Sequence, residues 1–90
     1  MNKAEFIDAV ASKGDISKSD AESAVNAVLD SLTDAMAKGE QVTLVGFGTF
    51  LVRPRKARQG RNPQTGATID IPASNAPSFK AGKALKDAVN

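Results

Sequence analysis

The sequence predicts an α+β fold in which a helical half comes first and a strand-rich half second. Residues 2–38 show the apolar spacing of two amphipathic helices, and after Gly39 the period changes to short β-rich runs. A basic stretch, 53–61, follows the second of these runs, and residues 83–89 return to a helical pattern. Ninety residues fit one small domain.

Both long helices have clear sequence boundaries. Asn2, with an acid three residues later, fits the N-cap of the first helix, and Gly14 is expected at its C′ position. Ser17 starts the second helix in the same way. Its apolar residues follow the i, i+3, i+4, i+7 pattern over 18–38, and Gly39 closes it.

The next segment predicts antiparallel strands. Residues 42–45 and 49–52 are β-rich runs joined by a tight turn at 46–48. We expect the second strand to continue outward as far as Arg58. Because Pro54 cannot donate to a ladder, this extension must be an edge or project from the sheet.

A turn at 62–66 then reverses the chain. Pro63 suits its i+1 position, and Gly66 tolerates a positive φ. Residues 68–71 alternate as a returning strand, and an irregular return is expected from Pro72 to Phe79.

Charge is divided unevenly along the chain. Residues 1–52 carry four lysines against eight acids, a net −4, whereas residues 53–90 carry eight bases against two acids, a net +6. Five of those bases lie within 53–61, a stretch without an acid. Such asymmetry indicates a docking surface for a polyanion, with nucleic acid the first candidate and an anionic membrane the second.

Composition excludes several classes of function. The chain has no cysteine and no histidine, so it lacks disulfides, thiolate metal sites and the commonest general base; we expect no enzyme, metal or cofactor. It has no apolar run long enough to span a membrane, and its N-terminus lacks the apolar core of a signal peptide, so a cytoplasmic protein is expected. Trp and Tyr are absent, and the phenylalanines Phe47, Phe50 and Phe79 are expected in the core rather than stacked on bases. A nucleic-acid binder of this composition uses charge and shape.

The predicted core is small. Residues 53–74 contribute little beyond Ile69 and Ile71, and an isolated two-stranded hairpin is marginal in water. About 68 residues must then provide the stability, which is close to the size at which one core becomes scarce. The apolar stripe of the helical hairpin is wide enough to face both its own sheet and a second copy, so we expect a dimer.

Several motifs resemble those of the bacterial histone-like HU and integration host factor family. They are Gly46-Phe47-x-x-Phe50, then Arg55, Arg58 and the run from Gly60 to Gly66 (GRNPQTG), and later Ile71-Pro72-Ala73 and the segment from Pro77 to Leu85 (PSFKAGKAL). The resemblance extends over the whole chain with ordered spacing, which makes it highly specific.

The resemblance implies an intertwined α+β dimer with a helical hairpin base, a three-stranded antiparallel sheet with an extended β-ribbon arm, and a short C-terminal helix. Residues 1–52 and 75–90 would form the dimerisation body and 53–74 the arm. The implied function is architectural: the protein would bend and compact double-stranded DNA in the bacterial nucleoid with little sequence specificity, its arms in the minor groove.

The resemblance also assigns DNA-binding residues. Pro63, held by Asn62, would be the wedge at the arm tip. Arg55, Arg58 and Arg61 would lie near the groove, Arg53 and Lys56 at the root of the arm, and a saddle on the body would consist of Lys3, Lys80, Lys83 and Lys86.

This sequence departs from the family pattern at two positions, and two alternative functions are considered. The returning strand brings Asp70 rather than a base, and Pro54 inside the outgoing strand is expected to bend or loosen the root of the arm. The alternatives are one chain of a sequence-specific heterodimeric host factor and a basic RNA-binding module. The compact ending at Asn90 favours a homodimer of the HU type, with a related second chain and structured RNA as further candidate partners.

Overall fold

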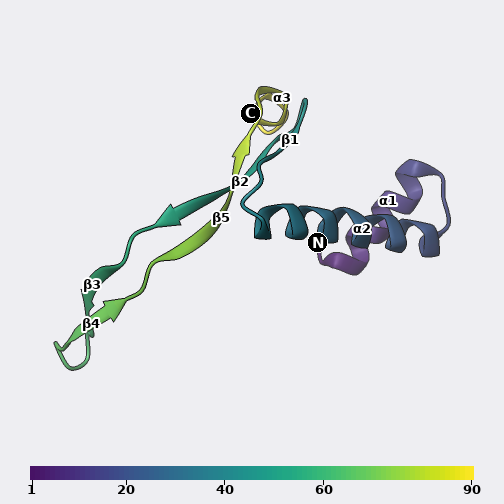
Figure 1. Ribbon diagram of the computed structural model, residues 1–90. Helices are drawn as coiled ribbons and strands as arrows, with labels where there is room; N and C mark the ends of the chain where they lie inside the picture. Colours follow the sequence, from purple (N-terminus) through teal and green to yellow (C-terminus); the bar gives the residue numbers. More distant parts are fainter. The chain divides into compact units, whose positions relative to one another are not determined.

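The computed structural model describes residues 1–90 as two compact units, Met1–Ala35 and Met36–Asn90. The first unit is helical, and the second contains all the strands and the last helix (Figure 1). The elements are α1 (Lys3–Gly14), α2 (Lys18–Ala37), β1 (Val42–Leu44), β2 (Gly48–Arg55), β3 (Arg58–Arg61), β4 (Thr68–Ile71), β5 (Ser74–Ala81) and α3 (Lys83–Ala88). The α+β prediction and the order of its elements are confirmed.

The predicted helix starts are present in the structure. The Asn2 side-chain oxygen accepts a hydrogen bond from the Glu5 backbone N–H at 2.9 Å, and the Ser17 hydroxyl accepts one from the Asp20 N–H at 3.1 Å. Each cap satisfies an N–H group that has no partner within its own helix. Gly39, with a φ of 78°, follows the end of α2 as predicted.

The end of α1 differs by one residue from the prediction. Gly14 is the last helical residue, and Asp15 takes the left-handed conformation with a φ of 52°. The Ile16 N–H donates to the Ala11 carbonyl at 3.1 Å, and the Asp15 N–H donates to the Ser12 carbonyl at 3.4 Å. This is the Schellman pattern with Asp15 at C′, a position that a short polar side chain can also occupy.

The core of the first unit is small. Val10 and Ala11 of α1 pack at its margin. An exposed ion pair between Lys18 and Asp8, at 2.9 Å, also joins the two helices and contributes little to stability. The buried side chains are Ile7, Ala21 and Val25.

In the second unit, three strands form an antiparallel sheet in the order β1-β2-β5. Phe50 lies opposite Phe79 in the ladder, and the Phe79 ring centroid is 4.8 Å from that of Phe50 and 5.5 Å from that of Phe47. The Phe79 ring covers Gly48, where a Cβ would lie only 2.5 Å from the ring. The three phenylalanines therefore form one cluster on the sheet, but Phe47 is 44% and Phe79 42% exposed, so a single chain does not bury them in a core as predicted.

The return from the arm is regular, which the sequence reading missed. β5 pairs with β2 over eight residues, from Ser74 opposite Arg55 to Ala81 opposite Gly48, so the irregular return predicted up to Phe79 is wrong. Pro77 lies inside β5, which is an edge strand and so tolerates a residue without an N–H.

The turn between the first two strands is also displaced. β1 ends at Leu44, so Val45 belongs to the turn and is 98% exposed. Gly48, expected in the turn, is instead the first residue of β2. Gly46 supplies the positive φ, 84°, that this turn requires.

Beyond the sheet, β2 and β5 lead into the two-stranded ribbon β3-β4 (Figure 1). The outgoing strand does not continue unbroken to Arg58, because pairing stops at Arg55 opposite Ser74 and resumes at Arg58 opposite Ile71. The gap has two residues on each strand, so the register is the same on both sides of it. Pro72, which has no N–H to donate, lies in this gap.

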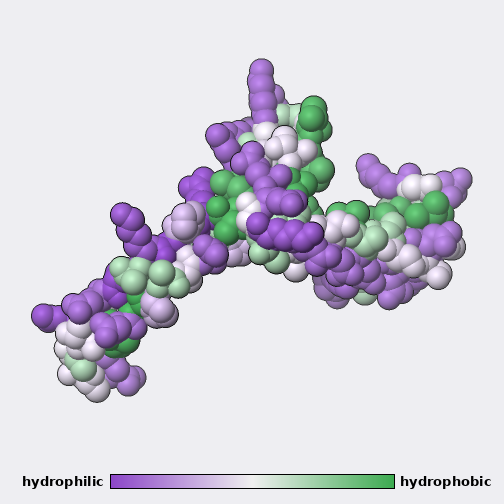
Figure 2. All heavy atoms as spheres, in the orientation of Figure 1, coloured by the Kyte–Doolittle hydropathy of each residue, from purple (hydrophilic) through white to green (hydrophobic).

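Much apolar surface remains exposed in the single chain. Figure 2 shows hydrophobic atoms at the surface over the three-stranded sheet. On α2, Val28 is 55% and Leu29 45% exposed, and on the sheet Leu44 and Phe79 are each 42% exposed. Side chains of this kind are normally covered in a stable protein.

Candidate nucleic-acid interface

The bases of the arm all lie on its outgoing strand. Arg53 and Arg55 are in β2, Lys56 is in the gap, and Arg58 and Arg61 are in β3. All five are exposed, and none forms an ion pair, since the one ion pair of the structure joins Lys18 and Asp8. Their charges are therefore available to an external anion.

The strand alternation divides these charges between two faces of the ribbon. Residues directly opposite each other on paired strands, or two apart on one strand, lie on the same face of the ribbon, whereas adjacent residues on a strand lie on opposite faces. Arg61 therefore shares a face with Gln59, Thr68 and Asp70, whereas Arg58 lies on the other face. The apolar members of that other face are Gly60, Ile69 and Ile71. The ribbon thus has one polar and one mainly apolar face, and each bears one arginine of β3.

The tip of the arm is organised by Asn62. Its backbone N–H donates to the Ala67 carbonyl at 2.9 Å, its carbonyl accepts from the Gly66 N–H at 2.7 Å, and its side-chain oxygen accepts from the Gln64 N–H at 2.9 Å. Gly66 has the predicted positive φ, 72°. These bonds fix the loop around Pro63, which is exposed between them. The structure therefore presents a rigid, apolar ring at the end of a basic ribbon.

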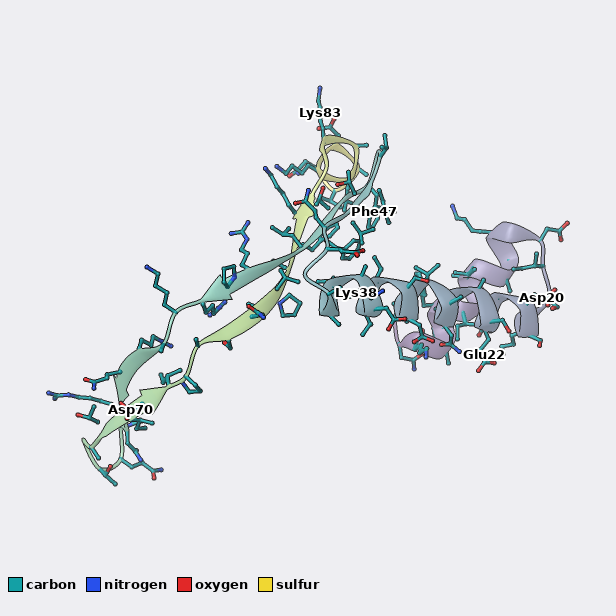
Figure 3. The ribbon with its side chains drawn as sticks, in the orientation of Figure 1. Asp20, Glu22, Lys38, Phe47, Asp70 and Lys83 are labelled. Atoms are coloured by element: carbon teal, nitrogen blue, oxygen red, sulfur yellow. The ribbon has the colours of Figure 1, made fainter.

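One contact of the arm is not among the sequence predictions. The Gln59 side-chain amide lies opposite Asp70, and its Nε2 donates to the Asp70 carboxylate at 3.5 Å. The position of the turn could have predicted this contact, because a turn closed by Asn62 and Ala67 sets the strand register that brings Gln59 and Asp70 together. In Figure 3, Asp70 lies on the ribbon, far along the arm from Lys83 of α3.

The predicted saddle lysines fall into two groups. Lys80 in β5 and Lys83 and Lys86 in α3 belong to the second unit and are exposed. Lys83 and Lys86 are three residues apart, so they share a face of the helix, and Lys83 extends outward from it (Figure 3). Lys3 is exposed at the start of α1, in the first unit.

Two other kinds of site are not present in the structure. No group of three His, Cys, Asp or Glu side chains is arranged to hold a metal ion. None of the three helices combines the length and the apolar character needed to cross a bilayer.

Comparison with known proteins gives matches over nearly the whole chain. The model of the family described as "Bacterial DNA-binding protein" matches residues 1–90. Among curated relatives, the DNA-binding protein HU of Staphylococcus aureus (strain COL) is 63% identical over 89 residues, 99% of each chain. The DNA-binding protein HU of Geobacillus stearothermophilus is 62% identical over the same share of both chains.

Solved structures have the same fold. The Anabaena HU–DNA cocrystal structure matches with a TM-score of 0.93 and 47% identity, covering 99% of this chain and 97% of that one. HU from Thermotoga maritima matches with a TM-score of 0.70 and 37% identity over the full length of both chains. The sheet, the ribbon and the last helix are therefore a known arrangement.

Proposed function

The chain belongs to the bacterial DNA-binding protein family, and from this premise we propose that it is an architectural protein of the nucleoid that bends and compacts double-stranded DNA. It acts without catalysis, metal or cofactor, by charge and shape. Its location is the cytoplasm, on the bacterial chromosome. Its sequence preference is weak, because a ribbon in the minor groove meets a nearly degenerate pattern of hydrogen-bonding groups.

The observation that carries the proposal is the exposed Pro63 on a loop fixed by Asn62, at the end of a basic ribbon. Apolar side chains of architectural minor-groove proteins, this family included, act as wedges between base steps and kink the duplex. Proline suits this role because it is rigid and has no N–H to leave unpaired. Unstacking costs a few kcal/mol per step, which further protein–DNA contacts must offset.

Those further contacts come from the exposed bases. Arg55, Arg58 and Arg61 follow the groove, and the two faces of β3 allow one arginine to point into the groove while another reaches phosphate. Arg53 and Lys56 add charge where the arm leaves the sheet. A body formed by 1–52 and 75–90 supports the arm, 53–74, and contacts phosphates through Lys3, Lys80, Lys83 and Lys86.

The functional unit is a homodimer. Only three side chains are buried in a single chain, whereas Val28, Leu29, Phe47 and Phe79 are each at least 42% exposed. A second copy would cover these surfaces and supply the core that one chain lacks. Light scattering should therefore give twice the 9.3 kDa chain mass, and Leu29→Asp should shift the protein toward an unfolded monomer. A stably folded monomer at micromolar concentration would refute the dimer.

A competition experiment tests the function. Wild-type protein is titrated against an intact linear duplex, a nicked duplex and a structured RNA of equal length, with dyes on the duplex ends to report bending by energy transfer. We expect tightest binding to the nicked duplex and a large rise in energy transfer. Preference for RNA over every DNA form would support the basic RNA-binding module instead, and strong selection of one DNA sequence would support a host-factor type of chain.

A further inference from the structure

We propose that Asp70, together with Gln59, makes the arm sensitive to the exocyclic amino group of guanine, so that binding favours minor grooves containing G·C pairs over pure A·T grooves. The inference rests on the proposed function, because it concerns the groove that the arm enters. It assigns a specificity-determining role to the acidic residue of the arm.

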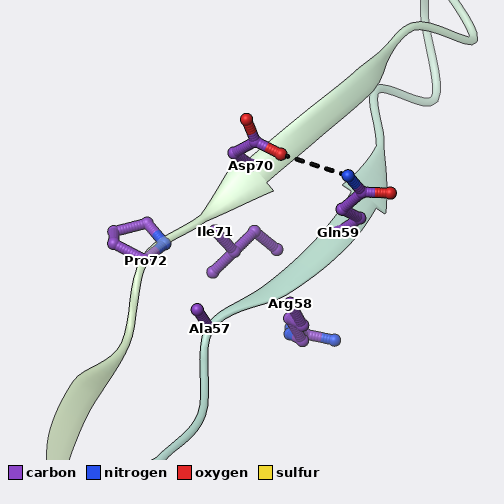
Figure 4. Close-up of a pocket in the computed structure, with 6 residues that line it drawn as sticks. All are labelled: Ala57, Arg58, Gln59, Asp70, Ile71 and Pro72. Atoms are coloured by element: carbon purple, nitrogen blue, oxygen red, sulfur yellow. Dashed lines mark hydrogen bonds between the residues drawn. The ribbon is translucent and has the colours of Figure 1, made fainter.

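The geometry brings two acceptor groups to the polar face of the ribbon. Asp70 and Gln59 are directly opposite in the β3-β4 ladder and are joined by the 3.5 Å bond from Gln59 Nε2 to Asp70 Oδ1 (Figure 4). That bond uses the amide donor and one carboxylate oxygen. It leaves the Gln59 carbonyl oxygen and the second Asp70 oxygen for other donors.

The surroundings leave this pair accessible to a ligand. Both side chains are exposed, and they line an open hollow of about 310 Å³ whose other lining residues are Ala57, Arg58, Ile71 and Pro72. Asp70 is the sole acid among residues 53–74 and forms no ion pair. Arg61 lies on the same face of the ribbon as Asp70. The positive charge that attracts DNA and the carboxylate that would distinguish base pairs in the groove are therefore on the same side.

The chemistry of the minor groove then determines the preference. A·T pairs present only acceptors there, adenine N3 and thymine O2, and narrow A-tract grooves concentrate negative potential. A carboxylate beside these groups meets like charge and finds no donor. The guanine N2 amino group is the one base donor in the groove, so it is the group that an acceptor pair such as Asp70 and Gln59 can recognise.

The test uses nicked duplexes that differ only in the segments flanking the nick, made of A·T, G·C or inosine·C pairs. Inosine lacks the N2 amino group. Wild-type protein should bind the G·C duplex roughly three- to tenfold more tightly than either of the others, the range expected for one exposed charge-assisted hydrogen bond. Asp70→Asn should bring the ratio close to one, because it weakens the hydrogen bond to guanine and removes the like charge from the A·T groove.

Asp87→Asn is the matched control, because Asp87 is the other acid of the basic half and lies in α3. It makes the same change in charge, so it should strengthen binding to all three duplexes alike and leave the ratios unchanged. Equal binding of G·C and inosine·C duplexes by the wild type, or an unchanged ratio in Asp70→Asn, would overturn the inference. If the protein binds all three duplexes equally tightly but still bends them, only this inference fails. If it bends none of them, the proposed function fails.

Discussion

Removing the two lysines of α3 should make DNA binding much less sensitive to salt. Lys83 and Lys86 are exposed, share a helix face and have no carboxylate partner, so each is free to neutralise one phosphate. We therefore expect the double variant Lys83→Gln/Lys86→Gln to lose two phosphate contacts per chain, which is four in the proposed dimer. Its helix should persist, because glutamine and lysine have similar helix propensities.

The magnitude follows from counterion release. At a slope of roughly 0.9 per phosphate, four lost contacts reduce the slope of log K against log salt by roughly 3.6. Over a fourfold rise in salt, from about 50 to 200 mM, the wild type should lose roughly a hundredfold more affinity than the variant.

Fluorescence anisotropy with a labelled nicked duplex at five or six salt concentrations measures these slopes. The matched control is Lys13→Gln/Lys38→Gln, which removes the same charge from two other exposed lysines. It should lower affinity slightly with little change in slope. Equal slopes for the two double variants would show that α3 makes no phosphate contact, and the reasoning from its exposed lysines would be wrong.

Three other outcomes are expected. Pro63→Ala should reduce DNA bending more than affinity, because it removes the exposed ring but no charge; an unchanged energy transfer between duplex ends would contradict the wedge. Gly48→Ala should lower the free energy of unfolding by about 1–3 kcal/mol, because the added Cβ would lie 2.5 Å from the Phe79 ring and 2.6 Å from the Lys80 carbonyl oxygen. Urea denaturation measures this change. A variant as stable as the wild type would mean that the Phe79 ring moves away freely. Asp15→Ala should lower the free energy of unfolding by about 1 kcal/mol because Asp15 has a left-handed φ of 52°, whereas Asp15→Gly should leave it unchanged. Equal melting temperatures of the two variants would argue against strain at this position.

Local signals predicted the helical half well. Asn2, Ser17 and Gly39 act through bonds or dihedral angles within a few residues, so their roles can be inferred from the sequence. The C′ residue of α1 was off by one, because glycine is the usual choice and the sequence offered Gly14 beside Asp15. The end of this helix depends on which residue takes the left-handed conformation that allows the Ile16 N–H to donate to the Ala11 carbonyl.

The strand half was less predictable, because its determinants are distant in sequence. Prolines at 72 and 77 indicated an irregular segment, yet Pro77 is compatible with a strand that lies at a sheet edge. That edge position is a property of the whole sheet. The bond between Gln59 and Asp70 likewise depends on the register of the ribbon. The proposed roles of the DNA-binding residues came from the family resemblance, because an exposed lysine or arginine looks the same in sequence whatever it contacts.

The equal gap in the arm has a consequence for insertions and deletions. Two unpaired residues on each strand separate the β2-β5 ladder from the β3-β4 ladder, and the register is kept across them. Adding or removing one residue on a single strand at this point would leave Gln59 opposite Asp70, because the turn at Asn62 and Ala67 sets that pairing, but the two ladders would no longer share one register. Changes of length at the gap therefore keep the two ladders in one register only when both strands gain or lose the same number of residues.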